Sequence, residues 1–374
     1  MKFINFNNAG SSFPSKNVNN SINKFLKYEE KYGGYYASEK FSEKLDTFYE
    51  NLSILINCKK HQISFLPSTT YALNIFFNSL NFPNNKNIVI FENEYGSNFI
   101  YFKKRELNLR VVKIKNNGEI CFKDLEKKID SKTIFISVCH IASQCGEIID
   151  IQKIGKIAKK INPNIIFIVD ACQSVGHIKL DVKKIQCDVL VGSGRKYLRG
   201  PRGTGFIFFK DTIKKTLTPS ILDMNNTKIK NGKIDVDRER MFESFESSPA
   251  LKYGLSKAIE EINQKGMETV ESEIKKKSNI FRKRLECFNQ IIFYENRRLL
   301  SGINTFNIKG FSAKKVYAYL LSKKILCSVS SRETSMMYFG KKNLTDLVRI
   351  SIHHYNTMSE IDYLIKCLID LIKK

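Results

Sequence analysis

Short apolar runs alternate with stretches of helical periodicity over much of the first 210 residues. The runs have the length and the β-branched and aromatic content of buried strands. They lie at residues 88–91, 111–114, 133–138, 165–169 and 189–191. A helical pattern separates each run from the next, for example at residues 151–161. This alternation predicts βαβ units, and therefore an α/β fold with a mainly parallel sheet and helices on both faces.

The pattern changes towards both ends of the chain. Residues 205–209 follow the preceding run too closely for a crossover helix, so we expect this strand to return antiparallel. The first residues are turn-rich. Beyond about residue 250 the order is a long helical pattern, two strand-like runs and a final amphipathic stretch, at residues 251–285, 303–308, 325–329 and 360–372. We predict an N-terminal arm (1–20), a large α/β domain (21–250) and a small α+β domain (251–374).

The composition narrows the class of protein. A hydrophobic content of 42% is that of a folded chain, and no apolar run is long enough to cross a membrane. The net charge of +25 favours anionic partners at low salt, but the basic residues are spread from end to end, so nucleic-acid binding is not expected. Nine cysteines without CxxC spacing, and no apolar signal segment, indicate a cytoplasmic protein without a zinc site or a disulfide framework.

A lysine in a glycine-rich loop is the most informative chemical feature. The loop at 192–196 places Lys196 just after an apolar run, and Asp170 stands at the end of the preceding run. Such a lysine can form a Schiff base with an aldehyde cofactor, and a carboxylate can keep the ring nitrogen of that cofactor protonated. A carboxylate at the tip of a buried strand needs a partner, which is either a pyridinium N–H or an ordinary helix cap. Together the two residues predict a pyridoxal 5′-phosphate site.

Hydroxyl and basic side chains near two strand ends predict a place for the phosphate, since α/β sheets bind ligands at this edge. Thr69 and Thr70 open a helix, and helix N-termini bind anions, although simple N-capping gives the same pattern. Ser193 and Arg195 flank the lysine and offer a hydroxyl and a cation to the same phosphate.

Three more residues complete the predicted site. Tyr95 follows the run at 88–91 and could stack on a flat ring, and Gln173 could hydrogen-bond the phenolic oxygen of the cofactor. Arg349 presents a planar fork that suits the carboxylate of an amino-acid substrate. Taken alone, the tyrosine could be packing and the arginine a surface salt bridge. Their occurrence together with the lysine and aspartate favours an enzyme that acts on an amino acid.

With these residues, the chain resembles the class V aminotransferase family, the fold-type I pyridoxal-phosphate enzymes that include cysteine desulfurases. The resemblance spans residues 7–357 and is most specific at 170–173, 193–196 and 349–357. It implies a large domain with a mainly parallel, seven-stranded type of sheet and a smaller α+β C-terminal domain. It also implies a homodimer with active sites at the interface, where residues 242–248 resemble the segment that reaches the partner's phosphate.

The same resemblance implies a role for each site residue. Lys196 matches the Schiff-base lysine, and Asp170 and Gln173 match the partners of the pyridinium and the phenolate. Arg349 matches the arginine that binds the substrate carboxylate. The remaining matches are Tyr95 against the ring and, at the phosphate, Thr69, Thr70, Ser193 and Arg195.

The chain departs from the desulfurases of this family at several positions. They usually carry histidine where Tyr95 and Arg195 stand, and commonly asparagine where Ser143 stands. They also receive sulfur on a mobile cysteine upstream of the carboxylate-binding arginine. Here residues 330–335 contain no cysteine, and Cys327 lies within a strand-like run, where we expect core packing. The resemblance is therefore closer to the branch of isopenicillin-N-epimerase-like proteins and C–S lyases.

The predicted function is a C–S lyase without a persulfide-forming cysteine, which forms an external aldimine with an L-amino acid and acts by β-elimination. An aminotransferase or an amino-acid epimerase is the alternative, because one sequence does not determine which bond stands perpendicular to the cofactor ring. A non-catalytic basic nucleic-acid-binding protein with the same fold is a further alternative. It predicts a damaged site, whereas Lys196, Asp170 and Arg349 are all present.

Overall fold

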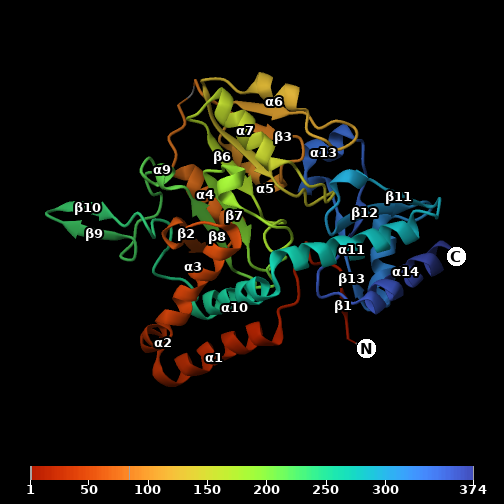
Figure 1. Ribbon diagram of the computed structural model, residues 1–374, viewed down its shortest axis with the longest axis horizontal. Coiled ribbons are helices and arrows are strands. Elements are labelled where there is room, and N and C mark those ends of the chain that lie inside the picture. Colours follow the sequence, from red (N-terminus) through yellow and green to blue (C-terminus); the bar gives the residue numbers. More distant parts are fainter. Residues whose placement is uncertain (1, 84, 374) are drawn as a thin grey trace.

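A seven-stranded sheet forms the centre of the computed structural model, which describes residues 2–83 and 85–373 (Figure 1). The strand order is β2-β8-β7-β6-β5-β3-β4, and β8 runs antiparallel to both of its neighbours while the pairs from β7 to β4 are parallel. The strands are β2 (Ile63–Leu66), β3 (Asn87–Phe91), β4 (Leu109–Val112), β5 (Thr133–Cys139), β6 (Ile166–Asp170), β7 (Val189–Ser193) and β8 (Gly205–Phe209). The predicted mainly parallel sheet and the antiparallel return of residues 205–209 are confirmed.

Both faces of this sheet are buried, which explains why its strands are continuous apolar runs in the sequence. In β3, Ile88 and Ile90 belong to one hydrophobic core, whereas Val89 and Phe91 belong to the other. The first core also contains side chains of α4 (Thr69–Asn78) and α5 (Gly96–Lys104). The second contains side chains of α6 (Phe122–Lys128), α7 (Ile151–Ile161) and α8 (Val182–Ile185). A short helix, α9 (Asp211–Lys214), follows β8.

Helices from the two ends of the large unit pack side by side. Both α1 (Lys16–Tyr32) and α3 (Ser42–Ile56) contact α10 (Pro249–Lys265), and α2 (Gly34–Lys40) connects the first two. Gly266, at a φ of 82°, ends α10 before α11 (Met267–Leu285) begins. The single helix expected at 251–285 is therefore two helices. The expected arm at 1–20 also includes the start of α1, and the division into three parts stays a prediction.

The C-terminal unit is built on a four-stranded antiparallel sheet, in the order β11-β12-β15-β14. Its strands are β11 (Ile291–Phe293), β12 (Ile303–Ile308), β14 (Ser328–Ser330) and β15 (Leu347–Ser351). Its helices are α12 (Ala313–Ser322), α13 (Met336–Lys341) and α14 (Met358–Ile372). The N-terminal β1 (Ile4–Asn5) pairs in parallel with β13 (Ile325–Leu326). Cys327 separates β13 from β14 and lies in the hydrophobic core, so its expected packing role is confirmed.

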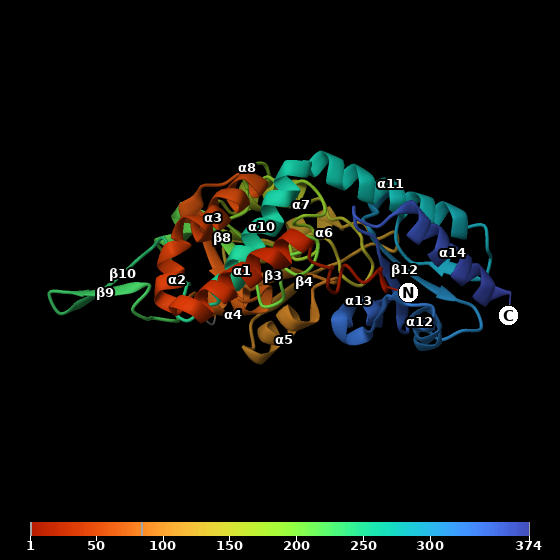
Figure 2. The same cartoon turned by 90° about the horizontal axis from the view of Figure 1, so that it is seen from below.

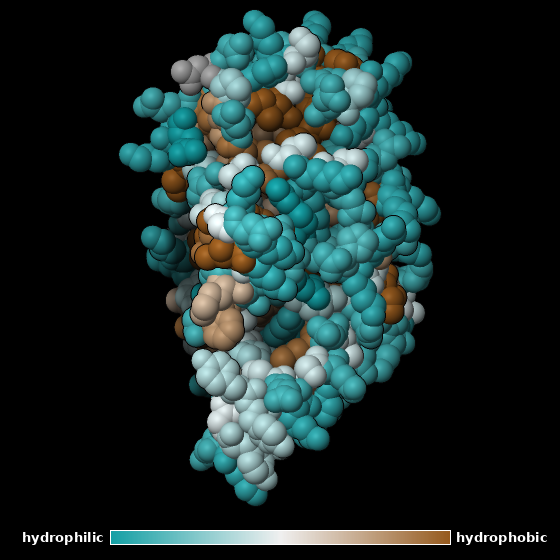
Figure 3. Space-filling view, turned by 90° about the vertical axis from the view of Figure 1, so that its left-hand side faces the viewer, coloured by the Kyte–Doolittle hydropathy of each residue, from teal (hydrophilic) through white to brown (hydrophobic). Residues whose placement is uncertain are grey.

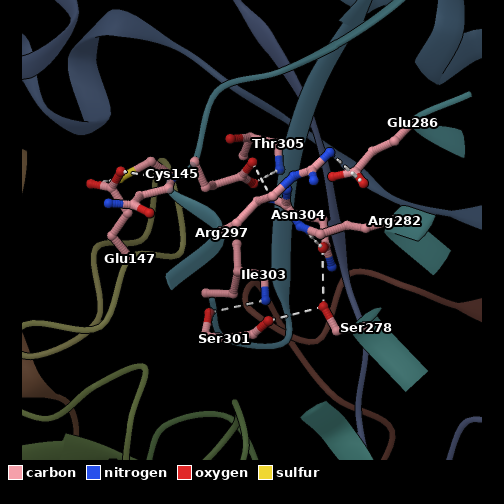
Figure 4. Close-up of polar contacts among 12 residues, drawn as sticks. Cys145, Glu147, Ser278, Arg282, Glu286, Arg297, Ser301, Ile303, Asn304 and Thr305 are labelled. Carbon is pink, nitrogen blue, oxygen red and sulfur yellow. Dashed lines mark hydrogen bonds and ion pairs between the residues drawn. The ribbon is translucent and has the colours of Figure 1, made fainter. Parts of the chain in front are cut away.

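A buried polar network lies within this unit (Figure 4). Arg282 of α11 forms an ion pair with Glu295, and its Nε donates to Asn304 Oδ1 at 2.9 Å. Ser278 Oγ donates to the same oxygen at 3.0 Å. From the large unit, Glu147 accepts the N–H of residue 296 at 3.3 Å. The bond to Glu147, which lies in the loop after β5, therefore links the two units.

A hairpin of β9 (Thr227–Lys230) and β10 (Lys233–Val236) projects from the large unit, as Figures 1 and 2 show. It carries exposed Ile229 and Ile234. The face of the molecule on that side is mainly hydrophilic, with scattered hydrophobic residues (Figure 3). Within the described residues, none of the helices is both long and apolar enough to cross a membrane.

Candidate active site

A cavity of about 360 Å³ lies at the carboxyl ends of the parallel strands. Its walls contain every residue predicted to hold or react with the cofactor, namely Thr69, Thr70, Tyr95, Asp170, Gln173, Ser193, Arg195 and Lys196. These residues come from the ends of β3, β6 and β7 and from the start of α4. The fold therefore assembles the predicted set in one place.

Asp170 is the last residue of β6 and is only 6% exposed. Its Oδ1 accepts the N–H of Cys172 at 2.9 Å, and its Oδ2 accepts from Asn98 Nδ2 at 3.3 Å. Burial raises the pKa of Asp170, while these hydrogen bonds and the charge of Lys196 act in the opposite direction. A cationic N–H donor in the cavity would stabilise the ionised form further. The aspartate thus orders the turn after β6 and remains suited to a pyridinium.

Lys196 is held by two glycine-rich segments that hydrogen-bond to each other. Gly194 N donates to Thr204 O at 2.9 Å, and Gly200 N donates to Gly194 O at 2.8 Å. A Cβ on Gly194 would lie 2.1 Å from Thr204 Oγ1, so a side chain there has no room. Close approach of the two backbones therefore explains the glycines, and it fixes the 8% exposed lysine at the cavity wall.

A group of hydroxyls lies at the N-terminus of α4. Ser68 caps this helix, because its Oγ accepts the N–H of residue 71 at 3.1 Å. The capping role that could have explained the two threonines therefore belongs to Ser68. Thr69 Oγ1 lies 2.8 Å from Ser193 Oγ, and Cys172 Sγ lies 3.2 Å from the latter. Hydroxyls, a helix N-terminus and Arg195 in one cavity suit a phosphate.

Gln173 has one bonded and one unbonded polar atom. Its Nε2 donates to Ala9 O at 3.0 Å. Its Oε1 is buried and has no hydrogen-bond partner within the part of the chain that the structure describes. A buried acceptor without a donor is costly, so a ligand in the cavity is expected to complete this side chain.

Three stacked aromatic rings contact Gln173, and the middle ring belongs to the residue that follows Lys196. His177 lies 3.8 Å from Tyr197, between ring centroids, and Tyr197 lies 5.2 Å from His353. His177 Nδ1 bonds the carbonyl of Gln173 at 2.9 Å, and its Nε2 accepts the N–H of Gly302 at 2.8 Å. Burial lowers the pKa of His177 to about 4. The neutral stack therefore joins the residue next to Lys196 to the C-terminal unit.

Arg349, on β15, lies beside the cavity and is not among the residues that line it. Its Nη1 donates to the carbonyl of Ser143, a cavity residue, at 2.9 Å, and its Nε donates to Ser328 Oγ at 2.9 Å. Across residues 2–83 and 85–373, no hydrogen bond uses its Nη2 and no ion pair engages its guanidinium. The surface salt bridge considered as an alternative is thus absent there, and the guanidinium can still bind a carboxylate.

The cavity also contains residues to which the sequence analysis gave no role. Asn98 and Cys139 lie beside Asp170, Cys172 lies beside the hydroxyl group, and Arg202 and Thr204 come from the second glycine-rich segment. Asn98 follows Glu94 by four residues, and this short spacing was a usable signal for that residue. The two cysteines carried no comparable signal, because neither their spacing nor their neighbours mark them.

The polar groups of the cavity fit pyridoxal phosphate. Asp170 needs a cationic donor, Gln173 has an unfilled acceptor, and Lys196 supplies an amine. The hydroxyls at the start of α4 supply an anion site. A seven-stranded α/β sheet with these groups at its carboxyl edge defines a pyridoxal-phosphate-dependent enzyme of fold type I.

Comparison with known proteins gives the family. The sequence model described as aminotransferase class-V matches residues 4–364, so the chain belongs to the aminotransferase class-V family. A probable cysteine desulfurase of Borreliella burgdorferi is 33% identical over 395 aligned positions, which cover 99% of this chain and 92% of that protein. A probable cysteine desulfurase of Methanothermobacter thermautotrophicus is 28% identical, over 89% of this chain and 84% of its own length.

A solved structure agrees with this assignment. The apo structure of a cysteine desulfurase from Thermococcus onnurineus superposes with a TM-score of 0.91 at 25% identity, covering 99% of this chain and 95% of its own. The family, the fold class and pyridoxal phosphate as cofactor, all expected from the sequence, are therefore confirmed. The roles of the individual site residues stay predictions.

Proposed function

We propose that this protein cleaves the carbon–sulfur bond of L-cysteine, or of a close relative of it, as an enzyme of the cysteine desulfurase type. The observation that carries the proposal is the single cavity that contains Lys196 and Asp170 and adjoins Arg349. It is supported by the relative at 33% identity, a probable cysteine desulfurase matched over 99% of this chain. The C–S bond cleavage expected from the resemblance is thus retained, and the substrate is made more specific.

The cavity residues have distinct holding roles in this proposal. Asp170 pairs with the ring nitrogen, Gln173 accepts the phenolic O–H through its unpaired Oε1, and Tyr95 covers one face of the ring. The phosphate is held by the remaining predicted residues, namely Thr69, Thr70, Ser193 and Arg195. When bound, pyridoxal phosphate supplies an aldehyde that condenses with amines and a ring that accepts electrons from the α-carbon.

Two further residues act on the substrate. Arg349 binds the substrate carboxylate through the N–H groups that its bonds to Ser143 and Ser328 leave free. Nζ of Lys196 would hold the cofactor aldehyde and, once the amino group of the substrate has displaced it, would accept the α-proton of the amino acid. Lys196 is only 8% exposed, which limits the access of bulk water to that amine.

The destination of the sulfur is a separate question. The expectation of a reaction without a persulfide-forming cysteine finds no support among the relatives, which are named as cysteine desulfurases. The segment 330–335 contains no cysteine, yet it lies against the site, since a Cβ on Gly96 would lie 2.1 Å from the carbonyl oxygen of Glu333. The cavity itself contains the thiols of Cys139 and Cys172. The proposal is therefore tested with and without an external thiol.

Product analysis tests the reaction. With L-cysteine and an excess thiol reductant, we expect alanine and sulfide in equal amounts, because the reductant supplies the two electrons and two protons that the products require. Pyruvate, ammonia and sulfide would show β-elimination instead, and a pyridoxamine form without sulfide would show transamination. Lys196→Ala abolishes turnover, whereas Lys183→Ala, an exposed lysine on α8, retains it. No product from cysteine or from a panel of other amino acids contradicts the proposal.

The sulfur acceptor has its own measurement. After reaction with cysteine and no reductant, intact-protein and peptide mass spectrometry shows whether a cysteine of the enzyme has gained one sulfur atom. A homodimer and a cytoplasmic location, both expected from the sequence, belong to the same proposal. Sedimentation of the purified protein tests the first, and microscopy of a tagged chain tests the second.

A further inference from the structure

We propose that Glu94 carries the one proton retained by a pair of buried carboxyl groups, and so keeps its neighbour Asp170 ionised for the cofactor. The inference rests on the proposed cofactor site and concerns a residue without a role in it so far. Glu94 lies between β3 and α5, next to Tyr95, and is 1% exposed. It is a positioning residue, because it acts on the cofactor through Asp170.

The two carboxyl groups are connected by the same neutral side chains. Asn98 Nδ2 donates to Glu94 Oε1 at 2.9 Å and to Asp170 Oδ2 at 3.3 Å. Cys139 Sγ lies 3.2 Å from Glu94 Oε1 and 4.0 Å from Asp170 Oδ2. A single amide and a single thiol therefore contact both carboxyl groups. Ionising both acids would bring two like charges together in a buried space, which is unfavourable.

The surroundings determine which acid keeps the proton. Asp170 has a donor on each oxygen, from Cys172 N and Asn98 Nδ2, and Lys196 acts on it as a cation. All donors to Glu94, including the N–H of residue 95 at 3.0 Å, converge on Oε1. Its Oε2 is buried and lacks a partner among the residues described. Negative charge is therefore more stable on Asp170 than on Glu94.

The titrating groups near Glu94 are few. From β6 the carboxyl of Asp170 opposes its ionisation, and from β5 the thiol of Cys139 is a neutral donor whose own pKa burial raises well above the ordinary value. From α5, Asn98 does not titrate, and Glu94 forms no ion pair with any described residue. Burial raises the pKa of Glu94 to about 7. The proton is thus retained under acidic conditions and released in the alkaline range, as a property of the coupled pair.

Infrared spectroscopy of the unloaded protein tests the inference. A protonated carboxyl group has its own C=O stretching band, which disappears when the group ionises. In the wild type, the difference between spectra recorded about one to two pH units below and above neutrality should contain this band. Glu94→Gln, which is neutral and of equal size, should remove it. Glu92→Gln should retain it, since Glu92 is paired with Lys341 at 2.7 Å and lies two positions away.

A second readout uses the cofactor. In the loaded wild type, the visible absorption should change with pH near neutrality, and Glu94→Gln should lose that change while Glu92→Gln keeps it. If the glutamine variant does not fold, Glu94→Met provides the same loss of the titrating group. The inference is overturned if the band survives in Glu94→Gln or Glu94→Met, or if the wild type does not show it. Failure to take up cofactor contradicts the proposed function instead, and the infrared result still decides the role of Glu94.

Discussion

The neutral His177 makes a quantitative prediction about acid stability. Its pKa is about 4 in the folded protein because of burial, against an ordinary value near 6.5 for an exposed histidine. The folded state therefore binds fewer protons than the unfolded state between these values, and stability falls as the pH falls from about 6.5 towards 4. Near pH 5 this single residue lowers the free energy of unfolding by about 2 kcal/mol relative to pH 8.

His177→Phe tests this value because the ring that stacks on Tyr197 remains. The variant loses the bonds to the carbonyl of Gln173 and the N–H of Gly302 at every pH. Because these bonds are lost at both pH values, their effect cancels when the free energy of unfolding near pH 5 is subtracted from that near pH 8. We expect that difference to be smaller than in the wild type by about 2 kcal/mol. The control is Tyr197→Phe, which should leave the difference unchanged because it removes a hydroxyl that bonds to no described residue.

The assay is urea unfolding followed by far-ultraviolet circular dichroism, since the chain contains no tryptophan. Wild type and both variants are measured near pH 5 and near pH 8. An unchanged pH difference in His177→Phe would refute the reasoning. It would mean that the imidazole is protonated in the folded protein, or that water reaches it in the stack.

Three further predictions concern the cavity and the lysine loop. An alkylating reagent should modify Cys172 more slowly once pyridoxal phosphate is bound, whereas the exposed Cys287 reacts equally in both states, as peptide mass spectrometry would show. Arg349→Lys should raise the KM for the amino acid by about 10- to 100-fold and leave the visible spectrum unchanged, because a lysine cannot make the paired hydrogen bonds of a guanidinium. Gly205→Ala should lower the unfolding free energy by about 1–3 kcal/mol, since its Cβ would lie 2.8 Å from Gly192 O and 3.0 Å from Ser68 Cα. The first prediction is contradicted if Cys172 is alkylated at the same rate with and without the cofactor. The second is contradicted by an unchanged KM in Arg349→Lys, and the third by an unchanged unfolding free energy in Gly205→Ala.

The sequence contained enough information for the sheet, because its strands are buried on both faces. In β3, consecutive residues such as Ile88 and Val89 face different cores, so the strand is an unbroken apolar run that is easy to recognise. The division of the helical pattern at 251–285 was missed for the opposite reason. Gly266 is compatible with helical periodicity, and its left-handed φ of 82° is a property of the folded backbone.

The site residues that neighbouring sequence identifies could be predicted. The contacts that depend on the order of the strands in the sheet could not. Lys196 and Asp170 follow apolar runs and could be read from the sequence. The relation between Glu94 and Asp170 depends on strand order, because β5 lies between β3 and β6 in the sheet and brings Cys139 to both. In the same way, the sequence contains Arg349 but not its contact with the carbonyl of Ser143.

The most direct test of the account is the site of covalent attachment of the cofactor. Pyridoxal phosphate is added to the purified protein, the complex is reduced with borohydride, and the labelled peptide is identified by mass spectrometry. We predict that a single lysine, Lys196, is labelled. The chain is rich in basic residues, with 62 Lys and Arg in total, so this selectivity is a strict test. We also predict that Lys196→Ala has no visible absorption after dialysis. Labelling of a different lysine, or a coloured Lys196→Ala variant, would contradict the assignment of Lys196 on which the proposed chemistry depends.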